Sequence, residues 1–373
     1  MNIGEEMLRF IDTPALIVDI PAMRANVREY QSAVSSYGVK LRPHVKTHKM
    51  PLIAKMQIEE GAAGIVVAKI SEAEVMADAG IDDIFVCFPI VGEEKLDRLS
   101  SLNRRLKRLL VEVDSIEGAM LLSKHAVKNG ELFEVVAEVD VVNAGRTGFK
   151  FETAVDEIVK VSSLPGLKVV GIFAYAYMST RNGTASSPEE AGINEGSMTV
   201  KLADELRARG INIEMVAGGS SPTGRYVASV PGITEVHPGT YVFYDTMSRF
   251  YGVTKEQCAA AIVATVVSSD EHRACIDAGS KTFSTDLPID CAPLWLEGYG
   301  TIVGRDDLRL DHLSEEHGVI TSKKQEEVNL PVGTKVVIIP NHICPCVALH
   351  DFAYFIEGRR VEKVRIEARG KLN

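Results

Sequence analysis

A cluster of nitrogen-bearing side chains stands out in the segment KLRPHVKTHK, at residues 40–49. Its members are Arg42, His44, Lys46, His48 and Lys49. A lysine forms an imine with an aldehyde readily when nearby cations and desolvation lower its pKa. A solvated basic loop is the alternative interpretation. We take Lys46 as the candidate nucleophile and its neighbours as the candidate source of the field around it.

Two glycine-rich turns further along the chain could bind an anion. They are AGGSSPTGR at 217–225 and HPGTY at 237–241. Glycines let backbone N–H groups approach a phosphate closely, and hydroxyl side chains add further donors. The candidate residues are Gly218, Gly219, Ser220, Ser221, Gly239, Thr240 and Tyr241. Each turn alone could be an ordinary turn, but a phosphate site together with a reactive lysine suggests pyridoxal 5'-phosphate (PLP).

Two more side chains could contact a planar cofactor. Arg146 lies on a glycine-flanked loop in VDVVNAGRTGF at 139–149, where it could bind a phenolate oxygen or a substrate carboxylate. Tyr175 closes the run GIFAY and could stack on a ring. A surface arginine and a core tyrosine are the plainer interpretations.

A possible metal site lies near the C-terminus, in IIPNHICPCVALHD at 338–351. On an extended segment, His342 and Cys344 would point to the same side and could bind one metal ion. Cys346 would continue that alternation as a third candidate. Two protein ligands would leave positions open for water or substrate. An isolated His-x-Cys is more often structural.

The composition excludes several classes of protein. The 373-residue chain has a formal net charge of −10, which argues against a general nucleic-acid binder or a protein that adheres to anionic membranes. No apolar run is long enough to span a membrane, and the first residues lack the pattern of a signal peptide. Six cysteines are too few for a disulfide scaffold. We expect a cytoplasmic protein with reduced thiols.

The elements that must position these residues change in type along the chain. Short apolar runs alternate with amphipathic segments up to about residue 220. The runs are ALIVDI, VKLRPHV, GIVVAK, DIFVCF, RLLVEVD, FEVVAEVD, LKVVGIFAY and INIEMVAG. Eight such runs favour a (β/α)8 barrel over an open doubly wound sheet. We predict an α/β barrel over residues 11–247, then an all-β domain over 248–373 that also includes residues 1–10.

Seven segments in this order resemble the D-threonine aldolase and D-serine dehydratase family of fold-type III PLP enzymes, which is related to alanine racemase. The segments are TPALIVD, RPHVKTHK, GIDDIFVCFPIVG, HPGTYVFYD, IDAGSK, LSEEHG and PNHICPC. The resemblance covers nearly the whole chain. It implies that the chain is a lyase that uses PLP and a divalent metal ion.

The resemblance also implies roles for individual residues. Lys46 would be the Schiff-base lysine, with His44, Arg146, Tyr175 and the two glycine turns around the cofactor. His342 and Cys344 would bind the metal ion. His317, in SEEHG, would be a further catalytic residue. The family organisation implies a homodimer.

Two reactions on a small D-3-hydroxy amino acid stay open. Dehydration gives a 2-oxo acid and ammonia, whereas retro-aldol cleavage gives glycine and an aldehyde. Thiolate with imidazole suits Zn²⁺, with Mn²⁺ or Mg²⁺ as alternatives. In the family, His-x-Cys is typical of the dehydratases, so we favour dehydration of D-serine, D-threonine or 3-hydroxy-D-aspartate over D-threonine aldol cleavage. An amino-acid racemase and a non-catalytic PLP carrier are the further alternatives.

Overall fold

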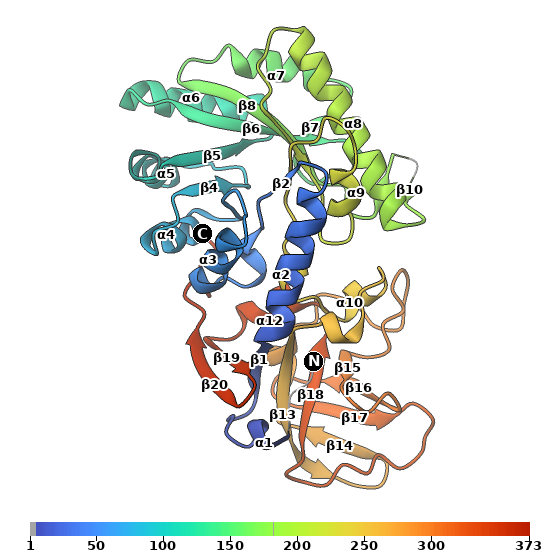
Figure 1. Ribbon diagram of the computed structural model, residues 1–373. Helices are drawn as coiled ribbons and strands as arrows, with labels where there is room; N and C mark the ends of the chain where they lie inside the picture. The colour runs from blue at the N-terminus through green and yellow to red at the C-terminus, as the bar shows by residue number, and fades with distance from the viewer. Residues whose placement is uncertain (1–4, 182) are drawn as a thin grey trace. The chain divides into compact units, whose positions relative to one another are not determined.

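The computed structural model describes residues 5–181 and 183–373, and it divides into two compact units (Figure 1). One unit comprises residues 28–46, 50–239 and 371–373, and the other comprises residues 1–27, 47–49 and 240–370. The boundary falls inside α2, Ile20–Ser35. Residues 1–4, which we grouped with the β domain, and Asn182 lie outside the described residues.

The first unit is built on parallel strands. Their order in the sheet is β2-β12-β11-β8-β6-β5-β4-β3. The strands are β2 Lys40–Leu41, β3 Ile65–Val67, β4 Asp83–Val86, β5 Arg108–Val113, β6 Phe133–Asp140, β8 Leu167–Ala174, β11 Met215–Gly218 and β12 Glu235–Val236. A parallel bridge between His44 and Val66 joins the two ends of this order. The predicted barrel followed by a β domain is therefore confirmed.

One strand of the barrel was assigned wrongly from the sequence. The run at 15–20 forms β1, Ala15–Asp19, which pairs with β13 and β19 in the sheet of the other unit. The eighth barrel strand is instead the two-residue β12. Because β1 is buried on both faces, its continuous apolar run looks the same as that of a parallel barrel strand.

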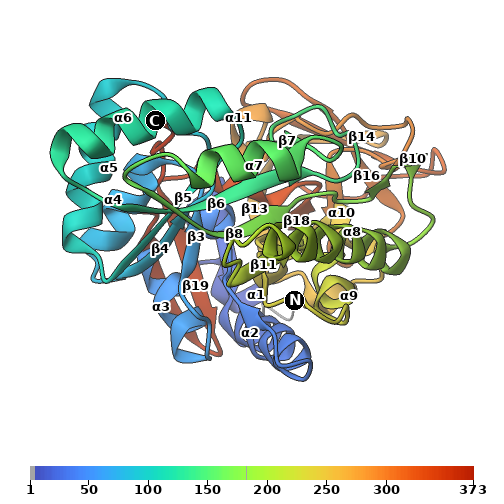
Figure 2. The ribbon, with the colours of Figure 1, turned by 90° about the horizontal axis from the view of Figure 1, so that it is seen from above.

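Helices connect the barrel strands and lie along the outside of the sheet (Figure 2). They are α3 Pro51–Glu59, α4 Ile70–Asp78, α5 Glu93–Arg105, α6 Ile116–Asn129, α7 Ala154–Ser162, α8 Pro188–Ala208 and α9 Gly224–Ala228. Short pieces complete the unit: β7 Phe149–Lys150 pairs with β6, and β9 Ser179–Thr180 pairs with β10 Gly183–Thr184. In α6, Ser115 accepts from the Gly118 N–H at the start and Gly130 ends the helix with a φ of 65°.

The barrel interior consists of an apolar layer below a polar one. Phe85, Leu110, Val136 and Phe173 belong to one buried cluster on four strands of the sheet. Side chains two positions further along a strand point to the same face. These positions hold Cys87, Glu112, Glu138 and Tyr175. The polar layer therefore faces the carboxyl ends of the strands, where barrel enzymes bind their ligands.

Arg42 lies at the opposite, amino-terminal end of the barrel. Its guanidinium, 2% exposed, donates to Glu235 Oε1 at 2.7 Å and to Asp83 Oδ1 at 2.5 Å. These two carboxylates are the first residues of β12 and β4. Burial acts to raise the pKa of Glu235, but Arg42 and His237 lower it to about 2. The expectation that Arg42 contributes to the field around Lys46 is therefore wrong, because its charge is neutralised at the barrel floor.

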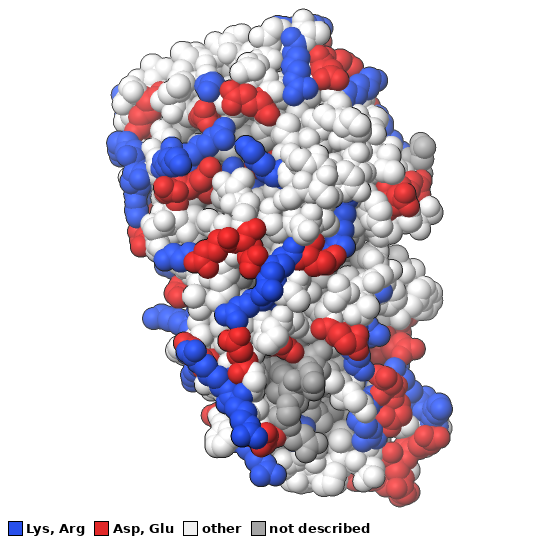
Figure 3. Space-filling view, viewed as in Figure 1, with Lys and Arg blue, Asp and Glu red and all other residues white. Residues whose placement is uncertain are grey.

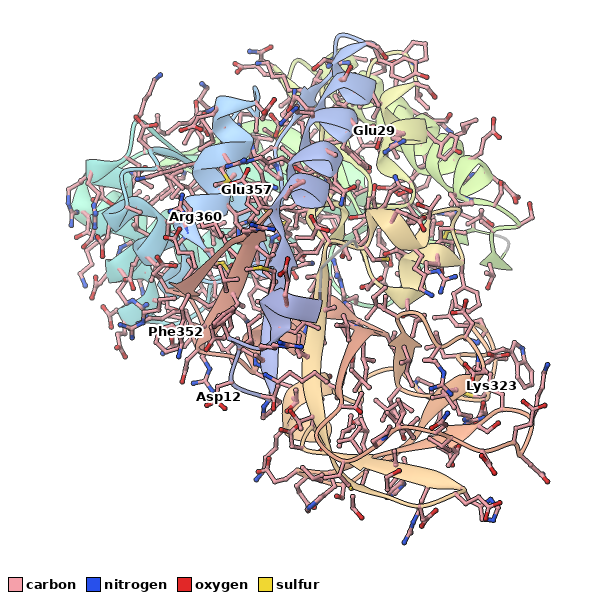
Figure 4. The ribbon with its side chains drawn as sticks, turned by 60° about the horizontal axis from the view of Figure 1, so that its bottom comes forward. Asp12, Glu29, Lys323, Phe352, Glu357 and Arg360 are labelled. Atoms are coloured by element: carbon pink, nitrogen blue, oxygen red, sulfur yellow. The ribbon has the colours of Figure 1, made fainter. Side chains whose placement is uncertain are left out.

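The second unit contains a mainly antiparallel sheet with the order β16-β17-β14-β13-β1-β19-β20, and β18 pairs with both β13 and β15. Its further strands are β13 Ala260–Ser269, β14 Arg273–Ile276, β15 Gly300–Ile302, β16 Leu308–Leu313, β17 Gly318–Ser322, β18 Lys335–Pro340, β19 Phe352–Glu357 and β20 Arg360–Arg365. Its helical pieces are α1 Glu5–Leu8, α10 Thr246–Arg249, α11 Ser280–Phe283, α12 Ile343–Ala348, η2 Thr240–Val242 and η3 Lys255–Gln257. Figure 4 labels Phe352, Glu357 and Arg360 on the β19–β20 hairpin, whose turn lies between the paired residues Glu357 and Arg360.

The charged side chains of both signs are interspersed over the face shown in Figure 3. Within the described part of the chain, no helix combines the length and the apolar character that a membrane span requires.

Candidate active site

Lys46 lies on the one-turn helix η1, Val45–Thr47, just after the first barrel strand. Its side chain is exposed, and Nζ lies 6.0 Å from the centroid of the Tyr175 ring. The backbone N–H of Lys46 donates to His44 Nδ1 at 3.4 Å, which places the buried His44 directly beside the lysine. Lys46, His44 and Tyr175 are thus brought together.

Arg146 reaches the same place from the loop after β6. Its guanidinium carbon lies 4.8 Å from the centroid of the Tyr175 ring, and Nη2 donates to Glu138 Oε1 at 3.0 Å. Burial acts to lower the pKa of Arg146, but the charge of Glu138 raises it above the usual value. Asp140 shapes the loop by accepting from the N–H groups of Ala144 and Gly145. The arginine is therefore a supported cation beside the lysine and not a free surface side chain.

Three titratable groups below Arg146 were missed in the sequence. They are Cys87, Glu112 and Glu138, on or just after β4, β5 and β6. Burial, followed by contact with Glu138, raises the pKa of Glu112 well above the ordinary value. Burial and the two carboxyls likewise raise the pKa of the Cys87 thiol. The signal was present in DIFVCF, RLLVEVD and FEVVAEVD, where each strand places a polar residue two positions after an interior apolar one.

The first glycine turn follows β11, the seventh barrel strand now that β1 is excluded. Gly219 has a φ of 86°, and a Cβ there would lie 2.7 Å from the Gly224 Cα, so only glycine fits. The Gly219 N–H donates to the buried Glu195 Oε1 at 2.7 Å, and the Ser220 N–H donates to Thr223 Oγ1 at 2.9 Å. The Tyr30 hydroxyl donates to the carbonyls of Ser220 and Ser221. These internal hydrogen bonds hold the turn and use part of its set of donors.

Burial raises the pKa of Glu195 to about 7, against the effect of its backbone hydrogen bonds. A Cβ on Gly218 would lie only 2.7 Å from the Oε1 atom of Glu195. Glu195 is a residue that the sequence did not single out. Its hydrogen bond with the Gly219 N–H holds the backbone of the turn.

The second glycine turn follows β12. Gly239 belongs to the barrel unit, where the neighbouring Pro238 carbonyl accepts from the His44 N–H at 2.9 Å. Thr240 and Tyr241 begin η2 in the other unit, and Tyr241 is fully buried. This turn is therefore tied to the segment that carries Lys46.

His342 and Cys344 are neighbours, but not through the predicted extended conformation. His342 is extended, with φ −135° and ψ 110°, whereas Cys344 lies in the first turn of α12. The two side chains are close enough for each to shift the pKa of the other. Burial acts to raise the pKa of Cys344, but His342 lowers it below the ordinary value, with smaller effects from Thr240 and Thr47. Thr47 Oγ1, on the residue after Lys46, lies 3.1 Å from Cys344 Sγ.

Asp286 supports the histidine from the other side. Its Oδ2 lies 2.6 Å from His342 Nδ1. Burial acts to lower the pKa of His342, but hydrogen bonds with Asp286 and Cys344 raise it to about 10. Histidines that bind metals usually donate their second ring N–H to a carboxylate, which fixes the ring. Asp286 was missed because it lies 56 residues from His342 and belongs to no motif.

The suggestion that Cys346 is a third ligand is wrong. Because α12 is helical, Cys346 points away from Cys344, is fully buried and donates to the Thr282 carbonyl at 3.1 Å. Burial raises its pKa, so it stays a thiol. His317 is exposed on the turn between β16 and β17, where its carbonyl accepts from the Ser314 N–H at 2.9 Å.

The residues present fit both PLP and a divalent metal ion. An amine, an arginine, an aromatic ring and a glycine turn in which a Cβ would clash suit PLP. A thiol of lowered pKa beside an imidazole suits a borderline-soft ion such as Zn²⁺. In the described residues no group of three His, Cys, Asp or Glu side chains is placed to hold a metal, so water or substrate would complete the coordination.

Comparison with known proteins decides the family. Residues 18–247 match the family model described as alanine racemase, N-terminal domain, and residues 259–356 match a putative serine dehydratase domain. The D-threonine aldolase of Arthrobacter sp is 30% identical, over 98% of this chain and 95% of its own. The chain belongs to the D-threonine aldolase and D-serine dehydratase family. It is thus a PLP-dependent lyase, as predicted.

Other members of the D-threonine aldolase and D-serine dehydratase family also match this chain. The D-threo-3-hydroxyaspartate dehydratase of Delftia sp. is 30% identical, over 91% of this chain and 93% of its own. Its solved structure matches with a TM-score of 0.88, covering 96% of this chain and 98% of that chain. The alanine racemase of Clostridium difficile, at 14% identity and a TM-score of 0.69 over 95% of this chain and 99% of that chain, shares the fold alone.

Proposed function

We propose that this protein dehydrates small D-3-hydroxy amino acids, using PLP held by Lys46 and a divalent metal ion held by His342 and Cys344. The observation that carries the proposal is the His342–Cys344 pair, in which the imidazole lowers the pKa of the thiol and Asp286 is hydrogen-bonded to the imidazole. A metal ion binds the thiolate form of cysteine, which the lowered pKa of Cys344 favours. Zn²⁺ is the ion that this donor set favours.

Solved structures of a relative support the metal assignment. Those of the D-threo-3-hydroxyaspartate dehydratase include a cysteine-to-alanine variant in the metal-free form and a histidine-to-alanine variant. The two substituted positions lie two residues apart, the same spacing as His342 and Cys344. That relative is a dehydratase, which supports dehydration here.

PLP, the metal ion and the side chains of this chain would have separate roles in the reaction. Bound PLP supplies an electron sink for a carbanion at the substrate α-carbon, and a bound metal ion supplies a Lewis acid for the 3-hydroxyl. Lys46 Nζ would hold the cofactor and later take the α-proton. Arg146, which Glu138 supports, would orient the cofactor ring, and Tyr175 would pack on it. The glycine turn after β11 would receive the phosphate, and His317 stays a predicted catalytic residue.

D-threonine aldolase activity is the second candidate. It is favoured by the 30% identity to the aldolase of Arthrobacter sp, over nearly the full length of both chains. The two reactions differ in whether the α-proton leaves, as in dehydration, or the bond between the α- and β-carbons breaks.

Product analysis separates the two reactions. We expect D-serine, D-threonine and D-threo-3-hydroxyaspartate to yield 2-oxo acid and ammonia when the protein is loaded with PLP and Zn²⁺. Glycine and an aldehyde without oxo acid would instead establish the aldolase. Inversion of the amino acid that a chelator does not affect would indicate a racemase, and the absence of any turnover would indicate a PLP carrier. The homodimer and the cytoplasmic location stay predictions.

A further inference from the structure

In the polar layer of the barrel, the hydrogen-bond donors of the described residues do not reach all of the buried carboxyl oxygens. The Glu112 and Glu138 residues are 4% and 3% exposed. They lie on the adjacent strands β5 and β6, and burial, followed by the charge of Glu138, raises the pKa of Glu112. Glu138 Oε1 accepts from Arg146 at 3.0 Å, but among the described residues Glu112 Oε1 and Glu138 Oε2 have no hydrogen-bond partner.

The charges of this layer do not balance if both carboxyls are ionised. The groups that face Glu112 are Glu138 on β6, Cys87 after β4 and, at longer range, Asp114 on its own segment. Arg146 is the cation that hydrogen-bonds Glu138. Lys46 also faces this layer, but it acts on Cys87 at longer range and binds the cofactor in the proposed function. Two ionised carboxylates in contact and removed from water repel each other strongly, so such pairs retain a proton.

A metal ion is not the missing partner. Among the described residues, Cys87, Glu112 and Glu138 do not form a group that could hold one. A proton on one carboxyl would resolve both the excess negative charge and the missing hydrogen bond. It removes one charge and supplies a donor to the neighbouring oxygen. Arg146 favours the charged form of the carboxyl that it touches, so the proton belongs on Glu112.

We propose that Glu112 stays protonated and hydrogen-bonds Glu138, so that the pair carries one negative charge and holds Arg146 against the Tyr175 ring. Glu112 is then a positioning residue that acts through Glu138. The inference rests on the proposed function, in which Arg146 orients the cofactor ring. It deepens that function by setting the net charge of Arg146, Glu138 and Glu112 to zero.

The pair also makes cofactor binding depend on pH. Burial and Glu138 raise the pKa of Glu112, so the group is neutral below that raised pKa and ionised above it. Ionisation adds a second negative charge near Arg146 and breaks the hydrogen bond to Glu138. Cofactor retention should therefore weaken as the pH rises through the upper pKa of the pair.

The protonation state can be measured without cofactor. We expect the infrared carbonyl band of a protonated carboxyl at neutral pH in the wild-type protein, and its loss in the Glu112→Gln variant. The difference spectrum isolates Glu112, because Glu195 and Asp245, two further buried carboxyls of raised pKa, are common to both proteins. A difference spectrum without this band would overturn the proposal.

Cofactor retention then tests the positioning role with matched variants. The Glu112→Gln variant keeps a neutral donor toward Glu138 and should bind PLP within about 2-fold of wild type. The Glu138→Gln variant removes the charge beneath Arg146, and the Glu112→Leu variant removes the donor. Both should bind PLP roughly 10-fold or more weakly, the scale expected when a charged group loses its hydrogen-bonding partner.

The pH profile completes the test. Between neutral and alkaline pH, PLP affinity should fall more steeply in wild type than in the Glu112→Gln variant, which has no proton to lose there. A purely structural pair would respond alike to glutamine at either position, and equal losses would refute the inference. If wild type takes up no PLP, the proposed function fails, whereas the infrared result still decides whether Glu112 is protonated.

Discussion

Single side chains outside any motif support the candidate cofactor residues in one unit and the candidate metal ligands in the other. Glu138 holds Arg146, and Asp286 holds His342, at N–O distances of 3.0 and 2.6 Å. Neither carboxylate is needed to recognise the family, yet each determines the direction in which a recognised residue points. At this scale, the chemistry of a site depends on the partners of its functional groups as much as on the groups themselves.

Asp286 should matter for metal affinity. In the Asp286→Asn variant the imidazole of His342 loses the carboxylate that fixes its ring, and we expect metal affinity to fall about 10- to 100-fold. Metal content after dialysis against graded concentrations of chelator measures this. The Cys346→Ala variant is the matched control and should keep its metal, because Cys346 points to the Thr282 carbonyl. Equal metal loss in both variants would contradict the role of Asp286.

At the scale of elements, the turn after β11 shows why particular glycines are needed. Its backbone is fixed by Glu195, Thr223 and Tyr30, and its close approach to Gly224 leaves no space for a Cβ on Gly219. The same turn was recognised in the sequence only as a possible phosphate loop. The structure adds that a buried carboxylate, and not a ligand, receives the Gly219 N–H.

Replacement of Gly219 should therefore cost stability. The Gly219→Ala variant combines an unfavourable φ with a contact of 2.7 Å, and we expect the free energy of unfolding to fall by about 2–4 kcal/mol. Gly210 has nearly the same φ, 87°, but open space around its Cβ position. The Gly210→Ala control should lose only about 1 kcal/mol in the same urea titration. Equal losses would show that the close contact has no effect.

At the scale of the whole molecule, the two proposed binding functions belong to different units. Lys46, Arg146 and Tyr175 lie in the barrel unit, and His342, Cys344 and Asp286 lie in the β unit. The family models divide the chain in a similar way, with matches to residues 18–247 and 259–356. The candidate groups for cofactor and metal can thus be disrupted independently.

Removal of the metal should leave the cofactor in place. We expect a chelator to abolish turnover while the visible absorbance of bound PLP persists, because none of its proposed ligands is a metal ligand. The Lys46→Ala variant should show the converse, with no PLP absorbance and normal metal content. Activity should return when Zn²⁺ is added to the chelated enzyme. Simultaneous loss of metal and PLP on chelation would contradict this independence.

The sequence by itself determined the family, the order of barrel and β domain, and the residues whose chemistry is local to a motif. Lys46, Arg146, His342 and Cys344 could be found because each lies in a segment with a readable pattern. The interior carboxyls could have been found by the same alternation that identified the strands. An apolar run does not, however, specify which sheet it joins, so β1 was assigned to the barrel.

Only the tertiary structure decided the partners of these residues. It placed Arg42 at the barrel floor, turned Cys346 away from Cys344, and brought Asp286 to His342 across 56 residues. The physical reason is that hydrogen bonds and ion pairs depend on distances of about 3 Å, which chain separation does not specify. Residue type and spacing limit the possible chemistry, whereas packing selects which of those groups meet.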